Sequence, residues 1–156
     1  GGGGPCGLGG GDDFDISRAE RAVRAVFDVE AGAWSRTLIN VVVQAPFAEG
    51  SLRTAHRMKD LTQVGERASF VLKLSKDPDT DPQVYYDDVR MQMVARAYAE
   101  RFNALGPPKR VDFLAACVLQ LLDRPGRPHC GVERYIAGEY VKYNNNWDWA
   151  DDRRNT

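Results

Sequence analysis

Alternating hydrophobic and polar residues predict two adjacent strands in the first third of the chain. From Val23 to Val29 the hydrophobic side chains occupy every second position, which is the period of a β-strand. Residues 30–33, Glu-Ala-Gly-Ala, predict a hairpin turn, and Trp34 begins the return strand. The β-branched and apolar residues at 37–45 strengthen the prediction of this second strand.

The pattern between residues 46 and 75 predicts a helix and then a third strand. Pro46 and Gly50 are expected to end the second strand. Residues 51–61 place leucine, alanine and methionine at helical spacing, and the apolar residues 68–74 predict a strand. A short helix capped by Ser17 is also expected before the first strand, because a glutamate follows three residues later.

The longest predicted helix lies in the middle of the chain. Its apolar residues are spaced by three or four positions and form one stripe: Met91, Val94, Tyr98, Phe102 and Leu105. Gly-Pro-Pro at 106–108 is expected to end it. The apolar run 111–122 fits a buried strand or a helix, and residues 129–143 fit two strands joined at 137–138. The sequence therefore predicts an α+β fold, in which a curved, mostly antiparallel sheet carries one long helix.

The length and composition fit one folded domain. The chain has 156 residues, of which 43% are hydrophobic and 28% charged, so it can bury a core. Eight of its 15 glycines fall in residues 1–13. This segment is expected to be a flexible tail in front of a domain that spans residues 14–156, because glycine loses much entropy on ordering and brings no side chain to pack.

Net charge and cysteine content narrow the functional classes. The 21 basic and 22 acidic residues give a net charge of -1, without the basic excess of a general nucleic-acid or membrane-surface binder. No apolar run reaches the ~18 residues of a membrane span. Cys6, Cys117 and Cys130 form no CxxC pair, so neither a disulfide framework nor a local zinc site is expected. A reducing, cytoplasmic location is the expectation, with no nucleic-acid or membrane partner.

A lysine interrupts the apolar strand predicted at 68–74. Lys73 fits two interpretations, an edge-strand lysine that faces water or a lysine held over a nucleotide phosphate. Gly50 lies upstream of it, as a glycine-containing loop does in a kinase. One glycine is a weak phosphate-loop signal, so these residues alone leave both interpretations open.

Longer strings in the sequence carry a family resemblance. They are PFAEGSLR at 46–53, FVLK at 70–73, YYDDVRMQMVARAYAERFNALGPPKRVDFL at 85–114, LLDRPGRP at 121–128 and VERYIAGEYVKYNNN at 132–146. Together they resemble the alpha-kinases, a family of atypical serine/threonine protein kinases, and within it the elongation-factor-2 kinase and myosin heavy chain kinase branch. The resemblance covers about residues 20–156 and implies the N-terminal lobe of such a kinase.

The resemblance implies that two segments bind the phosphates of ATP. Lys73 matches the strand lysine that contacts phosphates. The segment Phe47–Arg53 matches a short glycine loop, which assigns nucleotide-binding roles to Gly50, Ser51 and Arg53. Glu49 departs from the family pattern, because a carboxylate in this loop would repel triphosphate oxygens unless it points away.

The resemblance also implies an adenine contact and a further lysine near the nucleotide. Glu133 and Tyr135 match the connector between lobes, whose main-chain groups pair with the edge of the base, and Lys142 matches a lysine just beyond it. Asp87 and Asp88, in contrast, are interpreted as charges that complement the dipole at the start of the long helix. Met91 and Met93 are interpreted as core residues.

Other parts of an alpha-kinase are expected beyond Thr156. They are the catalytic aspartate, the magnesium ligands and the ligands of a structural zinc, so the chain alone is expected to be inactive and to expose an apolar face where the second lobe docks. The resemblance implies transfer of the ATP γ-phosphate to Ser or Thr of a protein, and its named branch makes an elongation factor or a cytoskeletal protein the candidate substrate. The alternative is a non-catalytic interaction module with the same fold. Calmodulin is not expected to bind, because the segment in front of the domain is the glycine-rich tail, which has no basic helix with aromatic anchors.

Overall fold

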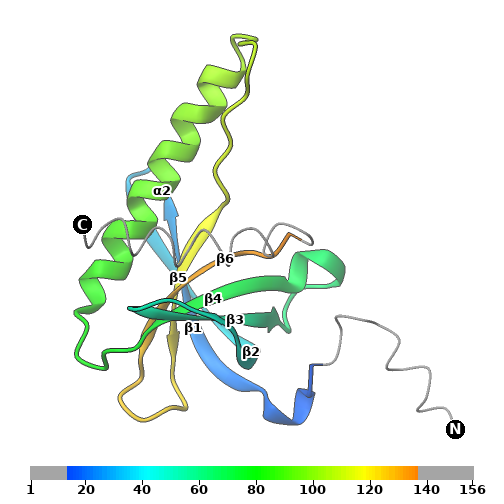
Figure 1. The fold of residues 1–156 in the computed structure, drawn as a ribbon, viewed down its shortest axis with the longest axis vertical. Helices are drawn as coiled ribbons and strands as arrows, with labels where there is room; N and C mark the ends of the chain where they lie inside the picture. Colours follow the sequence, from blue (N-terminus) through cyan, green and yellow to red (C-terminus); the bar gives the residue numbers. More distant parts are fainter. Residues whose placement is uncertain (1–13, 137–156) are drawn as a thin grey trace, which may run out of the picture.

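The structure is a six-stranded antiparallel barrel with one long helix beside it (Figure 1). The computed structural model describes residues 14–136. Its elements are η2 (Ile16–Arg18), β1 (Glu20–Asp28), β2 (Ala33–Glu49), β3 (Arg53–Asp60), η3 (Gly65–Ala68), β4 (Ser69–Ser75), α2 (Pro82–Asn103), β5 (Ala116–Leu121) and β6 (His129–Arg134). None of the described helices is long and apolar enough to span a membrane.

The strands close on themselves in the order β1-β2-β3-β4-β6-β5. Each neighbouring pair is antiparallel, and β1 pairs with β5 to complete the barrel. The predicted α+β class with a curved antiparallel sheet and one long helix is therefore confirmed, and the curvature is strong enough for full closure. Closure leaves none of the six strands as an unpaired edge.

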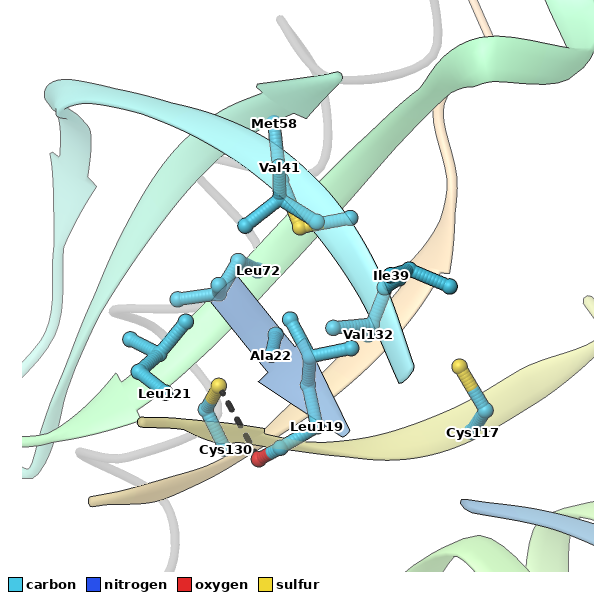
Figure 2. Packing of buried hydrophobic residues seen from close by; sticks show 10 residues of the cluster. All are labelled: Ala22, Ile39, Val41, Met58, Leu72, Cys117, Leu119, Leu121, Cys130 and Val132. Atoms are coloured by element: carbon cyan, nitrogen blue, oxygen red, sulfur yellow. Dashed lines mark hydrogen bonds between the residues drawn. The ribbon is translucent and has the colours of Figure 1, made fainter. Parts of the chain in front are cut away.

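The barrel interior is the main hydrophobic core. Figure 2 shows how side chains from all six strands converge on it: Ala22, Ile39, Val41, Met58, Leu72, Cys117, Leu119, Leu121, Cys130 and Val132. The Cys130 thiol donates a hydrogen bond to the Leu119 carbonyl oxygen at 3.5 Å. Burial raises the pKa of the Cys117 thiol to about 12, so this cysteine stays a protonated, apolar-like core residue.

The predicted helix at 51–61 is wrong, because these residues form strand β3. Residues Arg53–Asp60 pair with β2 on one side and with β4 on the other, so the main-chain N–H and C=O groups on both sides of the strand form hydrogen bonds within the sheet. Met58 faces the barrel interior while Ala55 is buried on the outside, which satisfies both apolar positions without a helix. Tertiary pairing thus overrides the helical spacing.

Strand β2 also extends further than predicted. It runs through Pro46 to Glu49 instead of ending at the proline, and the register with β3 shifts on both sides of Pro46. A β-bulge accommodates the missing N–H of a proline within a strand. The hairpin before β2 is confirmed, with Gly32 at φ 63° closing the turn by donating to the Asp28 carbonyl at 2.8 Å.

Helix α2 is confirmed, but the side that it buries differs from the prediction. Asp81 caps its start by accepting from the Gln83 N–H at 3.0 Å, Pro82 occupies the first turn, and Gly106 follows its end at φ 72°. Three residues on it are buried: Tyr85, Val89 and Ala99. The predicted apolar stripe is instead largely exposed, with Met91 at 67% and Leu105 at 81%.

The C-terminal part of α2 extends beyond the barrel. Figure 1 shows the helix rising well above the strands, with the following chain descending beside it to β5. Met91 is 67% exposed, so its interpretation as a core residue is wrong. That of Met93 is confirmed, because Met93 packs against the cluster of Ala25, Tyr85, Val89, Ala116 and Val118 between α2 and the barrel.

Three further predictions are refined at the ends of the described region. The expected helix before β1 is the single 3-10 turn η2, and its cap is Asp15 instead of Ser17. The apolar run 111–122 contains only the short strand β5. Of the two strands expected in 129–143, the first is β6, and the second lies outside the described residues, as do the tail 1–13 and Lys142.

Candidate nucleotide-binding site

The candidate site lies on the outer face of the barrel, where β3, β4 and β6 run side by side. Because strand side chains alternate between faces, the residues next to the inward-facing Leu72 and Val132 point outward. Directly opposed residues form one row across five strands: Ala55, Lys73, Gly131, Val118 and Ala25. Lys73 is the charged member of this row, and it has an alanine on one side and a glycine on the other.

Lys73 forms an ion pair with Glu133. The Lys73 Nζ lies 2.9 Å from Glu133 Oε1, and the two side chains are only 16% and 15% exposed. Glu133 opposes Val71 on β4, two residues from Lys73, so both charged side chains lie on the same face of neighbouring strands. The lysine is thus held at the barrel surface rather than extended into water.

Arg53 brings a second cation to the same place. It is the first residue of β3, and its Nη2 lies 3.4 Å from Asp88 Oδ2 on α2. The turn before it contains Gly50 and Ser51, and the Gly50 N–H donates to the Arg53 carbonyl at 2.9 Å. The predicted glycine loop is therefore the β2–β3 turn, and it positions Arg53 beside the helix.

A cavity of 460 Å³ joins these two ion pairs. Its polar lining includes Arg53, Lys73, Asp88 and Glu133, while its remaining wall is largely apolar and comes from α2, the segment before β5, and β5 and β6. Size and lining match small-molecule sites, which measure about 300–1,000 Å³ and are mostly apolar with a few polar groups. A phosphate entering it would meet two cations, each already neutralised by a carboxylate.

The negative charge of Glu49, which departs from the family pattern, is paired with a lysine in the structure. The Glu49 carboxylate lies 2.5 Å from Lys76 Nζ, beyond the end of β4. Glu49 is 63% exposed, and it does not line the cavity of Lys73. The expected repulsion of a triphosphate by this carboxylate is thus offset by a neighbouring cation.

Tyr135 lies further along the outer face, away from this cavity. Its N–H donates to the Ser69 carbonyl at 3.0 Å, and its ring packs on Ala48, Ala55 and Val71. The Arg57 guanidinium stacks on the ring at 4.1 Å from its centre. The Tyr135 N–H is therefore already hydrogen-bonded within the sheet. Glu133, for which the resemblance implied a main-chain contact, also lines the cavity and places its carboxylate next to Lys73.

Sequence reasoning missed three residues of the site. Asp88 was interpreted as a helix-dipole charge, yet α2 begins at Pro82 and the Asp88 side chain faces Arg53. Gln92 follows one turn later and donates to the Leu114 carbonyl at 2.7 Å, which ties the segment before β5 to the helix. Gly131 carried no signal at all, because its importance comes from the strand register that places it beside Lys73.

Within residues 14–136, no three His, Cys, Asp or Glu side chains come together as a metal site would require. The described carboxylates of the cavity, Asp88 and Glu133, are each paired with a cation.

The fold is similar to one part of a protein kinase domain of the alpha type. The alpha-kinase domain of myosin heavy chain kinase A in complex with ADP superposes with a TM-score of 0.68 at 30% sequence identity, covering 78% of this chain and 61% of that domain. The same domain in complex with AMP-PNP superposes equally well, with a TM-score of 0.68. The alpha-kinase family model matches residues 48–156. The chain belongs to the alpha-kinase family.

Two curated relatives show how much of a longer protein the match covers. Alpha-protein kinase 1 of Dictyostelium discoideum is 44% identical over 146 residues, which are 92% of this chain and 11% of that protein. Eukaryotic elongation factor 2 kinase of Homo sapiens is 38% identical over 141 residues, 85% of this chain and 19% of that protein. The chain thus spans about a tenth to a fifth of the length of these relatives.

Proposed function

We propose that this chain provides the ATP-binding lobe of an alpha-type protein kinase, which transfers the γ-phosphate of ATP to Ser or Thr of a protein. The observation that carries the proposal is that Lys73 and Arg53, from two adjacent strands, line one largely apolar cavity beside α2. The nucleotides bound to the related domain, ADP and AMP-PNP, support a nucleotide as the ligand.

The two cations suit phosphate binding in different ways. Lys73 presents a compact point charge from a strand that is hydrogen-bonded on both sides, while Arg53 presents a planar group with several donors. Glu133 and Asp88 hold these side chains in place before the ligand arrives. Phosphate oxygens would then compete with these two carboxylates for the cations, or share the cations with them. Nucleotide binding is therefore expected to loosen both ion pairs.

Phosphoryl transfer needs more than these cations. The reaction depends on positioning the nucleophile and on metal ions that bridge the phosphates. We propose that the catalytic aspartate and the ligands for Mg and Zn belong to the remainder of the kinase domain, so residues 1–156 alone are expected to be inactive. The named relatives make an elongation factor or myosin heavy chain the first protein substrates to test.

The test is Lys73→Met in the complete protein. We expect ATP affinity to fall about 10- to 100-fold, because a hydrogen bond to a charged group is worth about 1.5–3 kcal/mol, and phosphotransfer to fall with it. Lys59→Met is the matched control, since Lys59 is also a strand lysine at the barrel surface, on the neighbouring strand β3, but does not line the cavity. Unchanged ATP binding in Lys73→Met, measured by calorimetry, would contradict the proposal.

The exposed apolar side chains on α2 favour a second candidate, a non-catalytic interaction module. Met91, Tyr98 and Phe102 are each at least 45% exposed, and such a surface suits a macromolecular partner. The same variant separates the two functions. A module would show no phosphotransfer with or without Lys73, and its partner binding would not change in Lys73→Met.

A further inference from the structure

The β2–β3 turn has little packed support beneath it. Residues 50–52 connect Glu49, the last residue of β2, to Arg53, the first residue of β3. Leu52 at the tip of the turn is 58% exposed. Side chains of the turn and of the segment after β4 line a second cavity of 410 Å³, so no apolar core fills the space between them. The turn therefore depends on polar contacts to hold its position.

Lys76 contacts both ends of this turn. Its main-chain N–H donates to the Leu52 carbonyl at 2.9 Å, and its Nζ lies 2.5 Å from Glu49 Oε2. One contact lies on each side of Gly50 and Ser51. A single residue thus joins the start and the end of the turn to the segment that follows β4.

The segment that carries Lys76 is itself fixed to helix α2. The N–H of the preceding Ser75 donates to the Tyr85 hydroxyl at 3.0 Å, and Tyr85 is buried on α2 with 5% of its surface exposed. The Ser75 Oγ lies 2.7 Å from the Thr80 Oγ1, which donates to the Asp77 carbonyl at 2.8 Å. These bonds make residues 75–80 a compact loop, so Lys76 holds the turn from an anchored position.

We propose that Lys76 is a positioning residue, which holds the β2–β3 turn so that Arg53 faces a phosphate in the neighbouring cavity. This inference rests on the proposed function, because it takes Arg53 to bind a phosphate of ATP. It also gives Glu49 a role opposite to the one that its charge suggests. By pairing with Lys76, the carboxylate fixes the turn and strengthens nucleotide binding, although a negative charge near a triphosphate would by itself weaken it.

The experiment compares the binding of ATP and of adenosine to the complete protein by calorimetry. Adenosine has no phosphates, so the ratio of the two affinities reports on phosphate binding. The variants are Glu49→Gln, Lys76→Met, and a charge exchange that combines Glu49→Lys with Lys76→Glu. Asp123→Asn is the matched control, because it breaks another exposed ion pair, 2.8 Å from Arg21, whose residues do not line the cavity.

Amide hydrogen exchange, followed by mass spectrometry without nucleotide, reports on the turn itself. The Gly50 N–H donates to the Arg53 carbonyl within the turn, and the Lys76 N–H donates to the Leu52 carbonyl. Because local opening sets the exchange rate of such amides, the peptides that contain them should exchange about two- to fivefold faster in both single variants. The control should exchange like the wild type.

We expect the ratio of ATP to adenosine affinity to fall about two- to fivefold in Glu49→Gln and in Lys76→Met, which is the contribution of a partly exposed ion pair. The charge exchange should bring the ratio back to within about 1.5-fold of the wild type. Glu49→Gln is decisive, because loss of a repulsive charge alone would raise the ratio.

A higher or unchanged ratio in Glu49→Gln would overturn the proposal, and so would unchanged exchange of the turn peptides. An equal loss of ATP and adenosine binding would also overturn it, because that result indicates general damage to the site. If the wild type binds no ATP, the proposed kinase function fails, while the exchange rates still decide whether Lys76 holds the turn.

Discussion

The two faces of strands β4 and β6 have opposite roles. On the inner face, Leu72, Cys130 and Val132 are almost completely buried in the barrel core. On the outer face of the same strands, Lys73, Gly131 and Glu133 are partly exposed and line the cavity. Each strand therefore alternates, residue by residue, between a core side chain and a side chain that lines the candidate site.

This difference explains how the charged side chains of the candidate site are positioned although no buried polar network surrounds them. The strand backbone is fixed by apolar contacts on the inside and by hydrogen bonds to both neighbours. The outer side chains then need only short-range partners, such as Glu133 for Lys73. Substitutions on the two faces should consequently have separable effects, one on stability and the other on ligand binding.

The largest effect on stability is expected from Leu72→Ala. It deletes a completely buried side chain of the barrel core, and such substitutions cost about 2–5 kcal/mol of unfolding free energy. The cavity on the outer face is unchanged, so the folded fraction should still bind ATP like the wild type. Urea denaturation and calorimetry together measure both quantities.

Leu52→Ala is the matched control for this prediction, because Leu52 is 58% exposed in the β2–β3 turn. We expect its unfolding free energy to change by less than about 0.5 kcal/mol, as for most surface substitutions. Equal destabilisation by Leu52→Ala and Leu72→Ala would contradict the assignment of the inner face as the core.

A smaller effect, with opposite signs for stability and binding, is expected from Glu133→Gln. Removing the carboxylate that Lys73 contacts should cost about 1–3 kcal/mol of stability, as when a largely buried group loses a charged partner. Without this carboxylate, nothing competes with phosphate for the Lys73 ammonium group at that position. ATP should therefore raise the melting temperature more than in the wild type. Glu100→Gln, whose carboxylate is 64% exposed and pairs only at 3.8 Å, should change neither quantity. A smaller ATP-induced shift in Glu133→Gln would show that Glu133 supports binding instead of competing with it.

Elements with local signals could be predicted from the sequence. The β1–β2 hairpin depends on Asp28 and Gly32 within one turn, and α2 is delimited by Asp81, Pro82 and Gly106. These caps and turns act over a few residues, so their patterns are visible in the sequence itself.

Features set by distant pairing could not be predicted in the same way. Residues 51–61 have helical spacing, but β2 and β4 provide hydrogen-bond partners on both sides and make this segment a strand. The pair of Lys73 and Glu133 joins residues 60 positions apart, and only the strand register brings their side chains together. The resemblance predicted Lys73, Arg53 and Glu133 as site residues, and the structure brings them to one cavity, whereas the place of Asp88 depended on which side of α2 faces the barrel.

The smallest expected effect compares a histidine on each face under mild acid. Burial is the main cause that lowers the pKa of both His56, on the inner side of β3, and His129, on the outer face, where Arg36 lowers it further. A lowered pKa means that the unfolded chain binds more protons, so stability present above the unfolded pKa of about 6.5 is lost as pH falls below it. Urea unfolding at pH 7.5 and 5.5, above the range in which most carboxylates titrate, should therefore show a lower unfolding free energy at pH 5.5. The loss should be smaller in the double variant His56→Gln, His129→Gln, and an equal loss in both proteins would show that these histidines do not carry the pH dependence.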